Sequence, residues 1–178
     1  SDKIIEVSPF DDGRVFLCNS GSEANDTMIK MLWMLNLRKG NPHKRKIISR
    51  INGYHGVTLG ASSLTAKPYN EVFGFPLKDF IHTDCPHFWK YGLENETEEN
   101  FTKRMADNLE TLILKEDPNT IAGFIAEPVQ GAGGVIPPSK NYFDLIQPIL
   151  KKYKIPLIAD EVICGFGRTG NLWGCETY

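Results

Sequence analysis

The order of apolar and polar residues divides the chain into alternating strands and helices. Short, continuous apolar runs are typical of parallel strands that are covered on both faces of a sheet. Between them lie segments whose apolar residues are three and four positions apart, as in amphipathic helices. The predicted strands are 14–19, 46–51, 80–82, 120–126 and 155–159, and the predicted helices are 22–39, 57–66, 101–114 and 142–153. This alternation predicts an α/β fold, a mostly parallel sheet flanked by helices.

Composition and charge narrow the class of protein. The chain has 178 residues, which suits one domain or part of one, and 20 Lys and Arg residues against 22 Asp and Glu residues. A formal charge of −2 without a basic stripe argues against a nucleic-acid partner. No apolar run is long enough for a membrane span, and the N-terminus opens no signal-peptide pattern. We therefore expect a cytoplasmic protein with a small-molecule or protein partner. The four cysteines occur singly in the sequence, so we expect them to be reduced thiols.

Candidate chemistry follows from the places where the predicted strands end. In an open α/β sheet, ligands bind beyond the carboxyl ends of the strands. Those ends lead to Ser20-Gly21-Ser22, to Tyr54-His55, to Glu127, and to Asp160 with Val162. The four places are therefore predicted to converge on one rim of the sheet.

Each of these places has a structural and a functional interpretation. The small-residue turn at 20–22 opens a helix whose free N–H groups favour an anion such as phosphate, although a lone turn of this kind more often only caps its helix. Ser20 and Glu23 have the spacing of a capping box. Asp160 and Glu127 follow buried strands, so each is either paired structurally or used in chemistry. Tyr54 is either a core aromatic or a residue that stacks on a planar ring.

Taken together, these groups describe a site for a phosphorylated pyridine. A phosphate cradle, a stacking aromatic and a carboxylate that pairs with a protonated ring nitrogen fit pyridoxal 5'-phosphate, which withdraws electrons well only while that nitrogen is protonated.

Four segments resemble the successive signatures of class III (omega) aminotransferases, in the order of that family. They are Asn19-Ser20-Gly21-Ser22-Glu23-Ala24-Asn25-Asp26, Asn52-Gly53-Tyr54-His55-Gly56, Glu127-Pro128-Val129-Gln130-Gly131-Ala132-Gly133-Gly134 and Asp160-Glu161-Val162-Ile163-Cys164-Gly165-Phe166-Gly167-Arg168-Thr169-Gly170. The resemblance covers nearly the whole chain. It implies the large domain of a fold-type I pyridoxal-phosphate-dependent transferase.

The resemblance also implies a role for each site residue. Gly21 and Ser22 would hold the cofactor phosphate, Tyr54 would stack on one face of the ring and Val162 would pack on the other. Asp160 would pair with the pyridine nitrogen as a catalytic residue, and Glu127 would lie nearby on the side of the cofactor oxygen. His55, in the Tyr-His-Gly turn, is interpreted as a structural or cofactor-adjacent residue rather than as a general base.

The chain departs from the family pattern at two points. Ile163 stands where many members, such as the ornithine and 4-aminobutyrate enzymes, carry Gln, and this version is more similar to the pyruvate-dependent omega-aminotransferases. The lysine that forms the Schiff base follows on a further strand in the family, and neither Lys140 nor Lys154 occupies its place. We therefore expect residues 1–178 to be a partial cofactor-binding large domain, without the N-terminal segment, the lysine strand and the C-terminal small domain.

The implied reaction transfers an amino group from a primary amine or omega-amino acid to a keto acid such as pyruvate, in a homodimer. Two alternatives remain open: a non-catalytic fragment that binds phosphate or pyridoxal phosphate or only dimerises, and an aminomutase or racemase on the same scaffold. The segment 82–87 offers three potential metal ligands in close spacing, but a zinc site usually needs a fourth ligand and a second, paired set, and neither is evident, so no metal is expected. The glycines at 165–170 lack the order of a nucleotide-binding loop.

Overall fold

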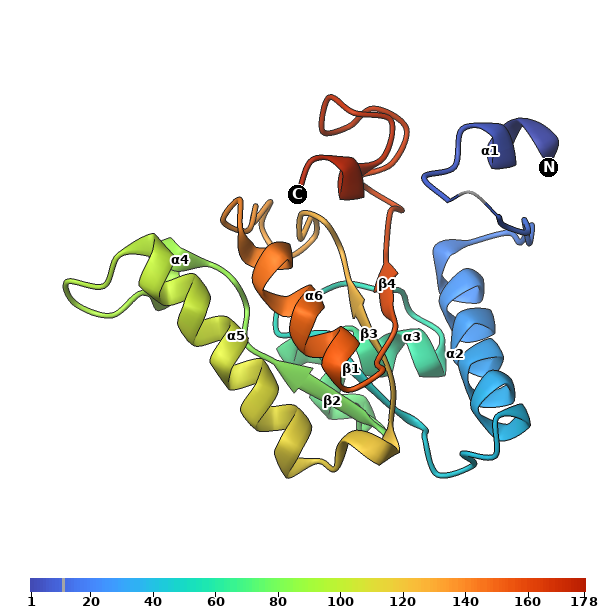
Figure 1. The fold of residues 1–178 in the computed structure, drawn as a ribbon, viewed down its shortest axis with the longest axis horizontal. Coiled ribbons are helices and arrows are strands. Elements are labelled where there is room, and N and C mark those ends of the chain that lie inside the picture. Colours follow the sequence, from blue (N-terminus) through green and yellow to red (C-terminus); the bar gives the residue numbers. More distant parts are fainter. Residues whose placement is uncertain (11) are drawn as a thin grey trace.

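A parallel four-stranded sheet forms the centre of the computed structural model, which describes residues 1–10 and 12–178. The strand order is β2-β1-β3-β4 (Figure 1). The strands are β1 (Lys46–Arg50), β2 (Phe80–Thr83), β3 (Ile121–Ala126) and β4 (Leu157–Ala159). The helices are α1 (Asp2–Glu6), α2 (Gly21–Arg38), α3 (Leu59–Leu64), α4 (Phe88–Tyr91), α5 (Glu98–Lys115) and α6 (Tyr142–Lys152), with 3-10 turns at Pro68–Phe73, Pro118–Thr120 and Gly174–Glu176.

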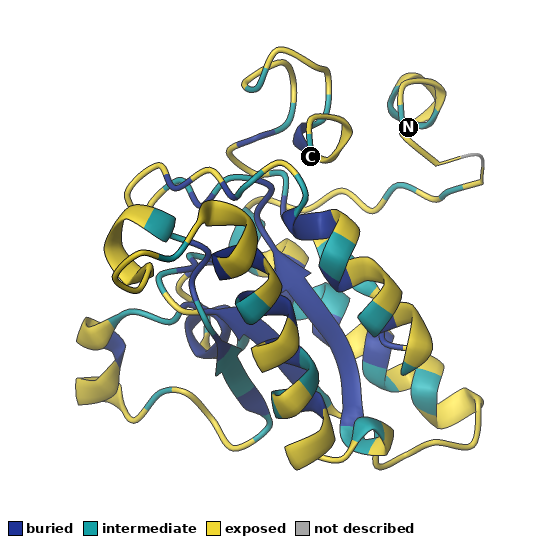
Figure 2. Ribbon diagram, turned by 60° about the vertical axis from the view of Figure 1, so that its left-hand side comes forward, coloured by how far each residue is buried: buried dark blue, intermediate teal, exposed yellow. Residues whose placement is uncertain are grey.

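Helices cover both faces of the sheet. On one face, Ile29 and Leu32 of α2 and Leu64 of α3 pack on the sheet, and α2 and α3 contact each other. On the other face, α5 and α6 bury a larger cluster that includes Phe101 and Ile146. Figure 2 shows the strands as the buried layer between exposed outer helix surfaces. This arrangement explains why β3 is buried at every residue and confirms the predicted α/β class.

Most predicted elements are confirmed with shifted ends, but the strand predicted at 14–19 is wrong. Residues 14–18 adopt no regular structure, and Phe16 and Leu17 are 63% and 71% exposed. The apolar run indicated a buried strand, yet the sheet that the structure describes places no strand beside it. A strand forms only where a neighbour completes its hydrogen bonds, and composition alone does not reveal that neighbour.

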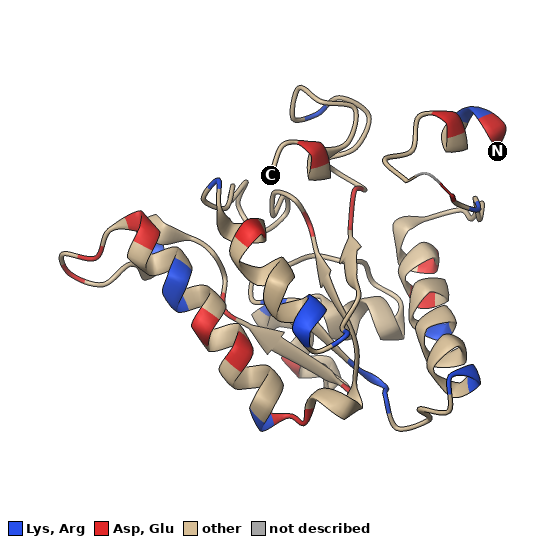
Figure 3. Cartoon of the chain, in the orientation of Figure 1, with Lys and Arg blue, Asp and Glu red and all other residues tan. Residues whose placement is uncertain are grey.

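Charged side chains of both signs are interspersed over the helices, as Figure 3 shows most clearly along α5. None of the helices among residues 1–10 and 12–178 is long and apolar enough to cross a membrane. The expectation of a small-molecule partner rather than a nucleic acid or a membrane stays a prediction.

Helix α2 begins where the capping pattern indicates. The Ser20 hydroxyl oxygen accepts a hydrogen bond from Glu23 N at 3.2 Å. The Glu23 carboxylate reaches back to Asn19 N at 2.8 Å, one residue earlier than in the usual capping box. The first turn of α2 is thus held at a fixed position before it meets any ligand.

Loss of this cap gives a first prediction. Ser20→Ala is expected to lower the free energy of unfolding, measured by urea denaturation without cofactor, by about 1 kcal/mol, because one terminal N–H loses its acceptor. Ser20→Asp keeps an acceptor at this position and should stay close to the wild-type value. Equal stability of Ser20→Ala and the wild type would show that the cap contributes nothing.

Candidate functional site

A pocket of about 180 Å³ lies beyond the carboxyl ends of β1, β3 and β4. Its lining residues are Gly21, Ser22, Tyr54, His55, Gly56, Glu127, Asp160, Val162 and Ile163. All six residues predicted as cofactor ligands are therefore brought together, although the first pair follows an irregular segment rather than a strand. A larger groove between Phe143 and Tyr178 is mainly apolar and contains none of these residues.

One end of the pocket is the N-terminus of α2. The backbone N–H groups of Gly21 and Ser22 have no hydrogen-bond partner within the described part of the chain. They point outward from the positive end of an 18-residue helix, where an anion is stabilised. A Cβ added at Gly21 would lie 3.0 Å from Val162 Cγ2, so the glycine leaves room for the Val162 side chain. The Ser22 hydroxyl accepts a hydrogen bond from Val57 N at 3.0 Å.

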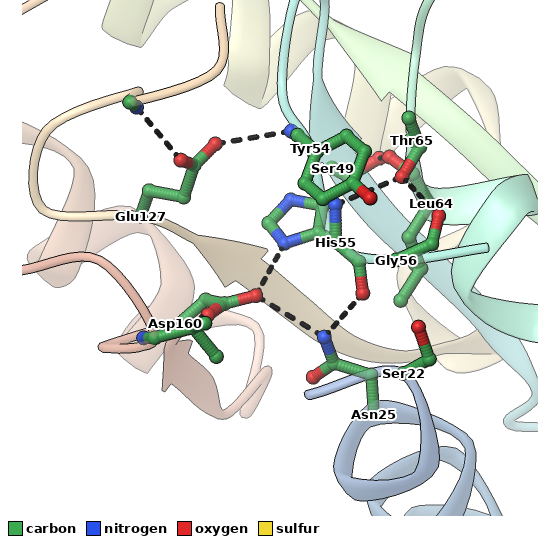
Figure 4. A network of polar contacts seen from close by, with 12 residues as sticks. Ser22, Asn25, Ser49, Tyr54, His55, Gly56, Leu64, Thr65, Glu127 and Asp160 are labelled. Carbon is green, nitrogen blue, oxygen red and sulfur yellow. Dashed lines mark hydrogen bonds and ion pairs between the residues drawn. The ribbon is translucent and has the colours of Figure 1, made fainter. Parts of the chain in front are cut away.

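The other end of the pocket carries Asp160, which is only 7% exposed. Its Oδ2 contacts His55 Nδ1 at 2.8 Å and accepts a hydrogen bond from Asn25 Nδ2 at 3.1 Å, and its Oδ1 accepts from Val162 N at 3.2 Å (Figure 4). Burial raises the pKa of this carboxyl group, but the bonds from His55, Asn25 and Val162 outweigh burial and hold the pKa below its usual value. Asp160 is thus a carboxylate at neutral pH, as pairing with a protonated ring nitrogen requires.

Glu127 is held by backbone groups, not by an ion pair within residues 1–10 and 12–178. The side chain is 3% exposed, Oε1 accepts from Tyr54 N at 3.0 Å and Oε2 accepts from Gly131 N at 2.8 Å. The carboxylate therefore ties the loop after β1 to the loop after β3, and it fixes the backbone of Tyr54 at the pocket wall.

Tyr54 and Val162 supply the less polar walls of the pocket. Tyr54 is half-buried, and a ring that still meets solvent at a pocket fits the stacking interpretation better than the core interpretation. Val162 is 71% exposed although it lines the pocket, so its side chain is available to a flat ligand. Ile163 lines the same pocket.

Two buried polar residues around the site were not predicted. Asn25 donates to both Asp160 and the backbone oxygen of His55, the latter at 2.7 Å. Arg50, at the end of β1, is 1% exposed, and one guanidinium nitrogen donates to the backbone oxygen of Glu127. The guanidinium carbon lies 5.6 Å from the Tyr142 ring centre, and Nη1 has no partner among the residues that the structure describes. The signal for both was a strongly polar residue at a position that should be buried.

In the segment that offers potential metal ligands, His82, Asp84 and Cys85 have other partners. His82 Nε2 contacts the backbone oxygen of Ser63 at 2.9 Å, Asp84 accepts from Asn108 at 2.7 Å, and the Cys85 thiol donates to Gln130 at 3.4 Å.

Comparison with known proteins identifies a family. The model of the family described as "Aminotransferase class-III" matches residues 1–178. The chain is 57% identical over 166 residues to gamma aminobutyrate transaminase 3, chloroplastic, of Solanum lycopersicum; the match covers 93% of this chain and 32% of that protein. It is 56% identical over 167 residues to a probable gamma-aminobutyrate transaminase 3, mitochondrial, of Oryza sativa. The chain therefore spans about a third of the length of these curated relatives.

Solved structures of aminotransferases also match this chain over its whole length. A PMP-bound aminotransferase from Vibrio fluvialis superposes with a TM-score of 0.98 at 66% identity, over 100% of this chain and 39% of that one. An omega-aminotransferase from Paracoccus denitrificans gives a TM-score of 0.98 at 66% identity, over 100% of this chain and 40% of that one.

Proposed function

Because this chain belongs to the class III aminotransferase family, we propose that it forms the cofactor-binding part of a transaminase. The complete enzyme would move an amino group from a primary amine or omega-amino acid to a keto acid such as pyruvate. The similarity to structures of omega-aminotransferases and to gamma-aminobutyrate transaminases supports this class of donor, since gamma-aminobutyrate is itself an omega-amino acid.

Enzymes of this family use pyridoxal phosphate, and a PLP-bound aminotransferase is among the matching structures. When bound, the cofactor supplies an electron sink for the carbon that carries the amino group. The residues of the pocket fit it: the free N–H groups of Gly21 and Ser22 suit the phosphate, and the ionised Asp160 suits the ring nitrogen. Tyr54 and Val162 would hold the two faces of the ring, and Glu127 would fix the loop that carries Tyr54.

The observation that carries the proposal is the pairing of an anion-binding helix end with a buried carboxylate in one pocket. The test is to incubate the complete protein with pyridoxal phosphate, reduce it with borohydride and locate a cofactor–lysine adduct by mass spectrometry. An adduct on a single lysine outside residues 1–178, with turnover that depends on a keto acid, is the expected result. An adduct without keto-acid dependence would favour an aminomutase or racemase.

A second function, non-catalytic binding of phosphate or pyridoxal phosphate, is proposed for residues 1–178 taken alone. It is supported by the pocket lining, which contains no lysine among the residues that the structure describes. A covalent adduct on one specific lysine of the 178-residue chain would exclude this second function.

Truncation of Tyr54 gives a second prediction. In the complete enzyme, Tyr54→Ala is expected to weaken retention of the cofactor at least about fivefold, because a stacked ring contributes about 1 kcal/mol beyond its buried area. Tyr54→Phe keeps the ring and should retain the cofactor as the wild type does. Equilibrium dialysis measures both values, and equal retention by Tyr54→Ala and the wild type would reduce Tyr54 to an ordinary aromatic contact.

We extend the proposal to assembly and location. A homodimer is supported by large apolar side chains that stay exposed beside the pocket and on α2: Val57, Leu59, Met31 and Met34. Light scattering of the complete protein tests whether it is a dimer.

A cytoplasmic location is supported by the four cysteines, which are free thiols.

A further inference from the structure

The hydrogen bonds around Asp160 are divided unequally between its two oxygens. An ionised carboxylate has about four acceptor positions, two on each oxygen. Oδ2 uses both of its positions, one for His55 Nδ1 at 2.8 Å and one for Asn25 Nδ2 at 3.1 Å. Among the residues that the structure describes, Oδ1 has one partner, Val162 N at 3.2 Å. The remaining acceptor position of this buried group is therefore on Oδ1.

We propose that His55 and Asn25 are positioning residues that saturate Oδ2 and reserve Oδ1 of Asp160 for the ring nitrogen of the cofactor. The inference rests on the proposed function, because it concerns how the same carboxylate meets pyridoxal phosphate. Neither residue is proposed to contact the cofactor itself. They act through Asp160.

The direction of the His55 contact follows from the charge of its partner. Asp160 is an acceptor only, since its pKa lies below the usual value. His55 Nδ1 must then carry a hydrogen and donate it. The His55 side chain is 1% exposed, so water does not compete for the contact. The bond therefore fixes which ring nitrogen holds the proton.

The loop that carries His55 is itself held rigidly. His55 N donates to Thr65 Oγ1 at 2.8 Å, and Thr65 Oγ1 donates to the backbone oxygen of Gly56 at 3.0 Å. Asn25 donates to the backbone oxygen of His55 at 2.7 Å while it also donates to Asp160. One amide group thus joins α2, the loop after β1 and the end of β4 around a single carboxylate oxygen (Figure 4).

The test compares a substitution that keeps the donor nitrogen in place with one that moves it. In His55→Asn the amide nitrogen takes the place of Nδ1, because both are bonded to Cγ. In His55→Gln the nitrogen lies one bond further out, near the place of Nε2. The complete enzyme is loaded with pyridoxal phosphate that carries ¹⁵N in its ring, and the ¹⁵N chemical shift reports the protonation of that nitrogen during a pH titration.

His55→Asn should keep the titration near that of the wild type, whereas His55→Gln should shift the protonation equilibrium towards the neutral ring by about tenfold or more, which is about one pKa unit. His43→Asn, at an exposed histidine, should change nothing. A His55→Gln enzyme that binds the cofactor and titrates like the wild type would overturn the inference while leaving the proposed function intact. Failure of the wild type to bind the cofactor would instead overturn the proposed function.

A second measurement needs neither a variant nor the cofactor. The ¹⁵N chemical shifts of the His55 ring in the cofactor-free complete protein distinguish a protonated Nδ1 from a bare one. A proton on Nδ1 is the expected result. A neutral ring with its only proton on Nε2 would overturn the inference, since Nδ1 would have nothing to donate to Asp160.

Discussion

Asp160→Asn is expected to slow the amine half-reaction of the complete enzyme by at least about 100-fold, or about 2.7 kcal/mol, the size of effect seen when one preorganised polar group is removed from an active site. The carboxylate is buried and ionised, so it would hold a proton on the ring nitrogen of a bound cofactor. A neutral amide in the same place provides no charge. The substitution changes little volume, so the pocket should keep its shape.

The effect is measured by single-turnover kinetics with excess amine and no keto acid, which isolates the first half-reaction. Asp144→Asn is the matched control, because Asp144 is an exposed carboxylate in the first turn of α6. An Asp160→Asn enzyme with an unchanged rate would show that Asp160 does not support the chemistry. A rate lost only because the cofactor is lost would be recognised by a matching fall in bound cofactor.

Gly56→Ala is expected to cost about 3 kcal/mol or more of stability and to abolish tight binding of the cofactor phosphate. Gly56 has a φ of +127°, a conformation that costs other residues about 1–3 kcal/mol. A methyl group there would also overlap Ser22 Oγ and come within 2.9 Å of Ser22 Cα and Ala61 Cβ. Such overpacking typically adds about 1–3 kcal/mol. Relief of the clash would push Ser22 away from the pocket.

Urea denaturation of the complete protein measures the stability, and equilibrium dialysis measures the cofactor. Gly40→Ala separates the two causes, because Gly40 also has a positive φ, of +76°, but nothing lies within 4 Å of an added Cβ. That control should lose only about 1 kcal/mol and keep its affinity. Equal losses of stability and of cofactor affinity in the two variants would mean that the clash between the added methyl group and Ser22 is unimportant.

The sequence predicted the sheet well because its central strands are buried. The run that became β3 is apolar throughout, and the run that became β1 has two adjacent isoleucines at its centre. Both runs are almost fully buried and lie between predicted helices, so burial and periodicity indicated the same elements. The segment 14–19 has a similar composition but no neighbouring strand in the described sheet. Pairing between strands is a property of the whole fold, and a local pattern contains no information about it.

The candidate site was predictable to the same degree. Asp160 and Glu127 could be located because each follows a strand, and strand ends meet at one edge of a sheet. The hydrogen-bond partners of Asp160 could not be located in this way. His55 and Asn25 are 105 and 135 residues away from it in the sequence, and only the folded chain shows that both donate to one oxygen. Arg50 was missed because a buried guanidinium contradicts the usual burial rule.

The position of Asn25 within α2 links the two ends of the pocket. Gly21 begins the helix at the anion-binding end, and Asn25 lies four residues further on, a rise of about 6 Å along a rigid helix. The same helix therefore carries both the free N–H groups of Gly21 and Ser22 and the amide that donates to the Asp160 carboxylate. One rigid helix thus carries both groups at a fixed separation along its axis. We therefore expect the pocket to prefer the phosphorylated ring to its dephosphorylated form, because only a ring with a phosphate arm would meet Asp160 and the N-terminus of α2 at once.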